Sequence, residues 1–358
     1  MNKKVIQEIK VGVAMSGGVD SSVATALMVA EYGKENVIGL TMKLFCYSDT
    51  IKEKSCCSLD AIGDARAVCG RLGVAHYVVN AEKEFEKDVI KNFITEYQEG
   101  KTPNPCVRCN KLIKFDYLLK KAQEFGVDLL ATGHYAQIVK DQAGYRLLKG
   151  KDENKDQSYF LYNLTQKQLE HVLFPLGAMT KPKVREIAKK YNLTTAQKKE
   201  SQDICFIPTT VADFLKTKKK SKSGNIVDNS GKILGQHNGL AFYTIGQRKG
   251  LGGGYKEPMF VIGSNREKNE LIIGPEKELY KDKLVLDKVS WISGREPSLP
   301  FVCDARIRYQ AKTTACQVQS FGEQIVVNLD QAQSAITPGQ SVVFYQGSEV
   351  LGGGIIAA

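Results

Sequence analysis

The sequence predicts an α/β fold in which a parallel-sheet domain is followed by a small β-rich central domain and a C-terminal antiparallel β-barrel. Up to about Tyr135, short apolar runs alternate with helix-length amphipathic stretches, a pattern typical of a parallel sheet with crossover helices. Later segments are glycine-rich and strand-like, and from Leu284 short β-branched runs separated by turns predict the barrel. We therefore expect domains at 1–212, 213–277 and 278–358.

The elements of the first domain can be placed in chain order. Buried strands are expected at 11–15, 37–45, 75–81 and 127–135. Helices are expected at 21–32, 59–72, 85–99 and 111–125. Each of these helices is followed by glycine, the residue that most often ends a helix. The α/β pattern continues through a helical stretch at 181–193 and a last helix at 209–216.

Composition and charge indicate the class of partner. Hydrophobic residues make up 42% and charged residues 25%, the balance of a globular protein. No apolar run is long enough to span a membrane, and the start "MNKKVIQEIK" does not resemble a secretory signal, so we expect a cytoplasmic protein. The net charge of +11 favours a polyanionic partner, most commonly nucleic acid. Five lysines between Lys216 and Lys222 are either a solvated linker or phosphate contacts.

The segment "VAMSGGVDSS" at 13–22 is typical of a phosphate-binding loop between a strand and a helix. Gly17 and Gly18 would let backbone N–H groups approach phosphate oxygens, and the helix N-terminus adds its positive dipole end. Asp20 would repel phosphate unless a cation lies between them, so we expect it to help hold Mg²⁺. The segment lacks the lysine of a P-loop, and it resembles instead the motif of PP-loop ATP pyrophosphatases. That resemblance implies cleavage between the α- and β-phosphates of ATP and an adenylated intermediate.

The nine cysteines include two that lie in reactive surroundings. Cys109 stands close to the start of a helix, beside Arg108 and Lys111, where the pKa of a thiol should be lowered. Cys205 follows a lysine-rich turn. Together with an adenylating loop, these thiols suggest sulfur transfer. The others are expected to be inert or spare, as with Cys56 and Cys57, or to be core residues, as with Cys46, Cys69, Cys303 and Cys316.

Nearly the whole chain resembles the tRNA-specific 2-thiouridylase family. The strings that carry the resemblance occur in family order: "AMSGGVDSS", "TPNPCVRCNKLIKFD", "ATGHYA", "KDQSYFLY", "KKESQDICFI", "YTIGQRKGLG", "TPGQSVVFY" and "LGGGII". The resemblance implies an ATP-dependent tRNA-uridine 2-sulfurtransferase that adenylates the C2 oxygen of the wobble uridine in tRNAs for Lys, Glu and Gln. Persulfide sulfur would then displace AMP, with a cysteine desulfurase or relay protein as the sulfur donor.

Site residues follow from the resemblance, position by position. Cys205 would carry the persulfide, and Cys109 would be the nucleophile that attacks it. ATP would be contacted by Ala14, Met15, Ser16, Gly17, Gly18, Val19, Asp20, Ser21, Met42 and Gly133. The tRNA would be contacted by Asn104, Pro105, Cys106, His134, Lys155, Asp156, Gln157, Arg308, Tyr309 and Gln340. Their types suit phosphate neutralisation, stacking and hydrogen bonding to unstacked bases.

One position departs from the family pattern, because Cys106 stands where the family has Asp. The change creates a Cys-x-x-Cys motif, so Cys106, Cys109 and Cys205 could hold an iron–sulfur cluster or a zinc ion. Persulfide chemistry without a metal is the preferred interpretation. At the level of function, the alternative is a small-molecule PP-loop ligase or synthetase, which would need neither paired cysteines nor a basic barrel. A purely RNA-binding protein would leave "SGGVDSS" unexplained.

Overall fold

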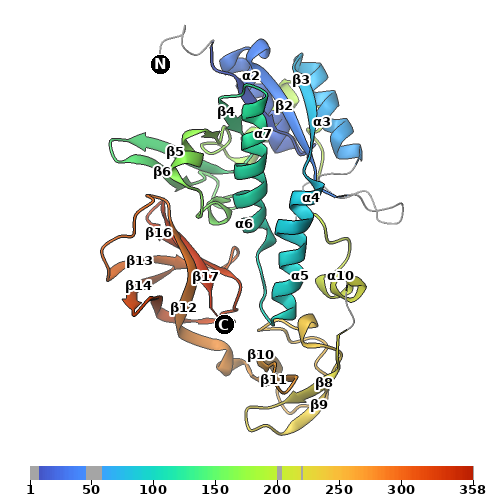
Figure 1. The fold of residues 1–358 in the computed structure, drawn as a ribbon, viewed down its shortest axis with the longest axis vertical. Coiled ribbons are helices and arrows are strands. Elements are labelled where there is room, and N and C mark those ends of the chain that lie inside the picture. Colours follow the sequence, from blue (N-terminus) through green and yellow to red (C-terminus); the bar gives the residue numbers. More distant parts are fainter. Residues whose placement is uncertain (1–7, 46–58, 200–203, 219–220, 358) are drawn as a thin grey trace.

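The structure, a computed structural model, describes residues 8–45, 59–199, 204–218 and 221–357. The expected roles of Cys46, Cys56 and Cys57, and the middle of the lysine run, lie outside the described residues. Figure 1 shows the parallel sheet at one end of the molecule and a small sheet at the opposite end, with the barrel beside them. The three-part α/β architecture is confirmed.

The first sheet has the order β3-β2-β1-β4-β7, and all of its pairings are parallel. Four of its strands were predicted, whereas β7 is too short to leave a pattern in the sequence. The chain leaves β1 toward β2 on one side and later adds β4 on the other, so a crevice opens at their carboxyl ends, where α/β folds bind ligands. The strands are β1 (Val11–Ala14), β2 (Val37–Lys43), β3 (Ala75–Asn80), β4 (Leu129–Ala131) and β7 (Val172–Leu173).

Helices cover both faces of this sheet. Buried residues of α2 (Val19–Tyr32), α3 (Leu59–Leu72) and α9 (Lys181–Lys190) form one core with the sheet, and α7 (Leu119–Glu124) packs into a second core with Leu40, Val79 and Leu130. The helix expected from 111 begins earlier, because Asn104 caps it and Pro105 takes its first position. The other helical segments are α4 (Glu82–Phe85), η2 (Glu86–Ile90), α5 (Lys91–Gln98), α6 (Pro105–Cys109), η3 (Asn110–Leu118) and α8 (Gln166–Glu170).

The central region is a small four-stranded sheet of order β10-β11-β8-β9 that follows α10 (Val211–Lys218). Its strands are β8 (Gly224–Val227), β9 (Ile233–His237), β10 (Met259–Asn265) and β11 (Glu270–Pro275). Short 3-10 turns lie at η1 (Lys34–Asn36), η4 (Ser158–Phe160), η5 (Leu240–Phe242) and η6 (Glu276–Leu279). This confirms the expected β-rich domain.

The C-terminal strands form an antiparallel barrel in the order β12-β15-β14-β13-β16-β17, closed by pairing of β12 with β17. Cys303 and Cys316 lie in its core, and Cys69 lies in the core of the first domain, which confirms the interpretation of these three cysteines. The strands are β12 (Tyr280–Trp291), β13 (Phe301–Arg306), β14 (Thr314–Phe321), β15 (Gln324–Ser334), β16 (Ser341–Gln346) and β17 (Glu349–Ile356).

A hairpin of the first domain extends the barrel's sheet. Strands β5 (Ala136–Asp141) and β6 (Gly144–Lys149) add to the edge of β17, where Val350 pairs with Leu147. Leu147 and Phe115 of the first domain share one buried cluster with Tyr345 and Val350 of the barrel. The two parts are therefore joined by hydrogen bonds and by a common core. Figure 1 shows the hairpin of β5 and β6 above the barrel.

This shared core predicts a stability difference between two matched variants. Val350 is fully buried in the cluster, whereas Val302 on the barrel is 69% exposed. Val350→Ala should lower the free energy of unfolding by about 1–3 kcal/mol, because it leaves a cavity at the junction. Val302→Ala should change it by less than about 0.5 kcal/mol. Urea denaturation of both variants measures the difference, and equal effects would contradict a shared core.

Candidate active site

The loop between β1 and α2 has the geometry of an anion site. Gly17 has a φ of 66°, and a Cβ atom on it would lie 2.4 Å from the carbonyl oxygen of Ala61, so only glycine fits. Gly18 is the N-cap of α2, and among the described residues no side chain caps this helix. The first N–H groups of α2 are thus left for a ligand, and the dipole favours a negative one.

The serines of the loop differ in what they can offer a nucleotide. Ser21 and Ser22 are buried, and their hydroxyls donate to the carbonyl oxygen of Gly18 at 3.1 and 2.8 Å. They therefore shape the loop in this conformation, while Ser16 is exposed. Met15 and Val19 are buried, so only their backbone atoms can face a nucleotide.

The remaining residues expected to bind ATP lie along the same edge of the sheet. Ala14 ends β1, and Met42 lies next to the end of β2. Gly133 follows β4 and approaches the loop so closely that a Cβ atom on it would lie 2.8 Å from the backbone carbon of Asp20. The structure therefore brings these segments together at the carboxyl ends of β1, β2 and β4, although contact with ATP stays a prediction.

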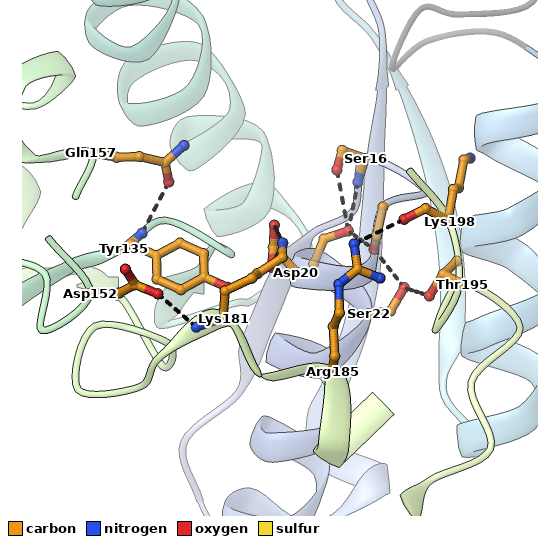
Figure 2. A network of polar contacts seen from close by, with 12 residues as sticks. Ser16, Asp20, Ser22, Tyr135, Asp152, Gln157, Lys181, Arg185, Thr195 and Lys198 are labelled. Carbon is orange, nitrogen blue, oxygen red and sulfur yellow. Dashed lines mark hydrogen bonds and ion pairs between the residues drawn. The ribbon is translucent and has the colours of Figure 1, made fainter. Parts of the chain in front are cut away.

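Asp20 is held by two residues that the sequence did not point to. The Lys181 ammonium donates to both carboxylate oxygens of Asp20, at 2.7 and 2.8 Å, and the Tyr135 hydroxyl donates to Oδ1 at 2.8 Å (Figure 2). The Lys181 side chain is 9% exposed, whereas that of Asp20 is 31% exposed. Lys181 is 161 positions from Asp20, and no local pattern could have linked them.

Both partners of Asp20 are fixed by the segment that is expected to meet the tRNA. The backbone N–H of Lys181 donates to Oδ2 of Asp152 at 2.8 Å. The backbone N–H of Tyr135 donates to Oε1 of Gln157 at 3.0 Å (Figure 2). The segment around 152–157 thus supports, through hydrogen bonds, the two residues that hold Asp20.

The segment at 195–198 contacts the same loop from the other side. The Lys198 ammonium donates to the carbonyl oxygen of Gly17 at 2.9 Å and also pairs with Asp64. Thr195 donates to the Ser22 hydroxyl at 2.9 Å, and Arg185 of α9 donates to the carbonyl oxygen of Ala196. The segment that precedes Cys205 is therefore held against the phosphate loop by hydrogen bonds. Sequence reasoning missed these residues, because they are unremarkable lysine-rich helix and turn positions.

Asp20 could bind Mg²⁺ only if Lys181 no longer occupied its carboxylate. Both of its carboxylate oxygens are engaged by Lys181, and in the described part of the chain no group of three or more His, Cys, Asp or Glu is arranged to hold a metal ion. Mg²⁺ commonly uses one or two carboxylates together with substrate phosphates. Asp20 can therefore serve Mg²⁺ in company with ATP, provided that the lysine moves away.

The two cysteines expected to act in sulfur transfer lie against the same core. Cys109 ends α6, and both it and Cys205 are partly buried against a cluster that contains Phe85, Phe93 and Phe206. Met42 packs against this cluster too. Cys106 is exposed at the second position of α6. Since the described residues contain no metal-ligand group, Cys106, Cys109 and Cys205 do not form a ligand set for a cluster or zinc in this conformation.

Asn104 and Pro105 have structural duties at the start of α6. The side-chain oxygen of Asn104 accepts from the backbone N–H groups of Cys106 and Val107 at 3.1 and 3.2 Å, and Pro105 is buried. Gln340 of the barrel donates to the carbonyl oxygen of Thr102 at 2.7 Å. The barrel therefore holds the loop that leads into the Cys109 helix.

His134 is buried beneath the same crevice. It is 8% exposed, its Nδ1 lies 2.7 Å from the Thr132 hydroxyl, and its Nε2 lies 3.5 Å from the Lys114 ammonium. Burial, and then the charge of Lys114, hold the pKa of His134 well below its usual value. The imidazole is thus neutral. Its ring packs against the aromatic rings of Phe115 and Phe174.

Of the other residues expected to contact tRNA, some lie near solvent and others contact the protein itself. Lys155 and Arg308 carry positive charge near solvent. Asp156 is buried and accepts from Gly150, Ser158 and Arg306, so it ties its segment to the barrel instead of facing solvent. The Tyr309 ring lies 4.4 Å from that of Phe160. Their contact with tRNA remains a prediction.

Comparison with known families follows the division of the fold. Residues 9–209 match the tRNA methyl transferase HUP domain, residues 212–275 the tRNA methyl transferase PRC-barrel domain, and residues 281–356 the aminomethyltransferase beta-barrel domain. These matches define an ATP-using tRNA enzyme of the HUP class.

Similar curated proteins narrow the class. The "tRNA-specific 2-thiouridylase MnmA" of Carboxydothermus hydrogenoformans is 49% identical, with 98% of each chain covered. That of Geobacter metallireducens is 48% identical, covering 98% of this chain and 97% of the relative. The chain therefore belongs to the tRNA-specific 2-thiouridylase family, and it is an ATP-dependent sulfurtransferase, which confirms the predicted family and enzyme class.

Solved structures resemble the chain only distantly. The U34-tRNA thiolase NcsA from Methanococcus maripaludis, solved with its [4Fe-4S] cluster, is 22% identical with a TM-score of 0.36, covering 57% of this chain and 66% of that one. The NMN synthetase from Francisella tularensis is 17% identical with a TM-score of 0.34, covering 56% of this chain and 76% of that one.

Within the described residues, no helix has the length and apolar character needed to cross a membrane.

The buried histidine predicts a pH dependence of stability. Below about pH 6.5 the unfolded chain binds a proton on this histidine, whereas the folded protein, with its lowered pKa, does not. His134 therefore makes the fold lose stability as the pH falls, by at most about 1.4 kcal/mol per pH unit. Denaturation at pH 7.5 and 5.5 should show a smaller acid loss for His134→Gln than for wild type. An equal acid loss in both proteins would contradict a neutral buried His134.

Proposed function

We propose that the protein converts the wobble uridine of tRNAs for Lys, Glu and Gln to 2-thiouridine, with ATP as the activating substrate. The observation that carries the proposal is the packing of Met42, Cys109 and Cys205 against one cluster beside the phosphate loop. This packing supports an activating site and two thiols that act together, although they lie far apart in the sequence.

In the first step the C2 oxygen of uridine attacks the α-phosphorus of ATP. The bond from that phosphorus to the oxygen bridging the α- and β-phosphates breaks, and pyrophosphate leaves. The N–H groups after Gly17 and at the start of α2 would bind the phosphates. Mg²⁺, when bound, would neutralise phosphate charge, and Asp20 is the residue that would hold it.

In the second step sulfur replaces the adenylate. The terminal sulfur of a Cys205 persulfide attacks C2, the C2–O bond breaks and AMP leaves. The Cys109 thiolate then attacks Sγ of Cys205, so that the sulfur–sulfur bond to the substrate breaks and a Cys109–Cys205 disulfide forms. The two electrons needed to leave sulfur as a thiocarbonyl come from these two thiols. A cellular thiol reductant restores them, and a cysteine desulfurase or relay protein in the cytoplasm renews the persulfide.

The tRNA would lie across the crevice and the barrel. The net charge of +11 suits its backbone, with Lys155 and Arg308 as phosphate contacts. Cys106 is the exposed residue of its loop, and we place the target base beside it, with Asn104 and Pro105 holding the loop. Asp156, Gln157, His134, Tyr309 and Gln340 would support or border that surface.

Three serine substitutions test the sulfur chemistry. Cys109→Ser and Cys205→Ser should lower tRNA thiolation by at least about a thousandfold, because a hydroxyl neither carries a persulfide nor attacks one at neutral pH. Cys106→Ser, on the same helix as Cys109, should keep measurable thiolation, because a bystander thiol can be replaced by a hydroxyl of similar size. Mass spectrometry of digested tRNA measures the product. Equal loss in all three variants, together with iron in the purified wild type, would favour the cluster instead.

A further inference from the structure

Lys181 carries its positive charge in a buried position. Its side chain is 9% exposed, and its ammonium contacts both oxygens of Asp20, the second residue of α2 and a neighbour of the phosphate loop (Figure 2). The Lys181 ammonium also lies over the ring of Tyr135, with Nζ 5.7 Å from the ring centroid. A buried ammonium requires an anionic or strongly polar partner, because desolvation of an unpaired charge is costly.

Asp20 can replace its partner in this ion pair more easily than Lys181 can. Asp20 is 31% exposed and can be satisfied by water or a hydrated cation, whereas Lys181 cannot be satisfied by bulk water where it lies. Phosphate oxygens that enter the loop would bring several negative charges close to the Asp20 carboxylate. The nearest replacement partner for the Lys181 ammonium would then be the phosphates themselves.

The backbone of Lys181 is anchored, and its ammonium stands on a stem of four carbons with rotatable bonds. Its N–H is bound by Asp152, and Lys181 is the first residue of α9. Two other cations of the described residues are directed elsewhere, since Lys198 is bound to Gly17 and Asp64, and Arg185 to backbone carbonyl oxygens. Lys181 is therefore the cation whose partner is a carboxylate of the phosphate site and whose flexible stem permits a change of partner.

We propose that Lys181 is a ligand of the β- and γ-phosphates of ATP, held on Asp20 while the loop is empty and transferred to the phosphates when ATP binds. The transfer releases the Asp20 carboxylate for a cation at the moment when the phosphates arrive. The inference rests on the proposed function only in taking the loop after β1 as the ATP site.

Binding of ATP and of AMP to variants of one helix tests this role without tRNA. Equilibrium dialysis in the presence of Mg²⁺ should show that Lys181→Met weakens ATP binding on the order of 10- to 100-fold, because a charge-assisted contact is lost. AMP, which lacks the β- and γ-phosphates, should bind within about twofold of wild type. The matched control is Lys183→Met, since Lys183 is exposed and paired with Glu186 on the same helix. It should bind both nucleotides as wild type does.

A double variant separates a phosphate ligand from a residue that acts only through Asp20. Asp20→Asn/Lys181→Met leaves no unpaired charge at this place, so it remains informative if the single variant fails to fold. It should bind ATP at least about tenfold more weakly than Asp20→Asn alone. Equal ATP affinity of these two proteins, unchanged ATP binding by Lys181→Met, or equal loss of ATP and AMP would each overturn the proposal. A wild-type protein that failed to thiolate tRNA would overturn the proposed function and leave this result standing.

Discussion

Strand β17 is the constraint on which the arrangement of the molecule depends. It pairs with β16, closes the barrel against β12, and pairs near its start with β6, a strand of the first domain. A barrel that shares a strand edge and a buried cluster with the catalytic domain cannot rotate without breaking both. The surface expected to hold tRNA is thereby kept in register with the crevice expected to hold ATP.

The same junction reaches the site through a few polar contacts. Gln340 holds the loop before the Cys109 helix, and Arg306 pairs with the buried Asp156. The segment that carries Asp156 fixes Tyr135 and Lys181, and these residues hold Asp20. Protein contacts therefore run without interruption from the barrel to the phosphate loop.

Local patterns in the sequence predicted the elements well. The four longest strands of the parallel sheet and the glycine-terminated helices depend on neighbouring residues, and all of them occur in the predicted order, although some of their ends differ. The early start of α6 was also readable, because Asn104 followed by Pro105 is an N-cap signal. The membership of β5 and β6 in the barrel was not readable, since it depends on pairing with residues about two hundred positions away.

Residue chemistry pointed to the phosphate loop, Cys109 and Cys205, and the resemblance supplied the remaining candidate site residues. Lys181, Lys198 and Tyr135 were missed because their roles arise from folding, with partners 161, 181 and 115 positions away. Asp156 was expected to contact tRNA; it is buried and has four hydrogen-bonding contacts within the protein, and its contact with tRNA stays a prediction. A charged residue in a functional segment can thus serve the scaffold, and only the tertiary structure distinguishes the two uses.

If tRNA is adenylated before sulfur is inserted, as proposed above, thiolation depends on ATP and releases AMP. The most direct measurement incubates the full-length protein with unmodified tRNA, ATP and a persulfide source, and quantifies 2-thiouridine by mass spectrometry alongside the nucleotide products. The account predicts 2-thiouridine at the wobble position, formed only with ATP and in equal amount to AMP and pyrophosphate. Thiolation without ATP, or with ADP and phosphate as products, would contradict it.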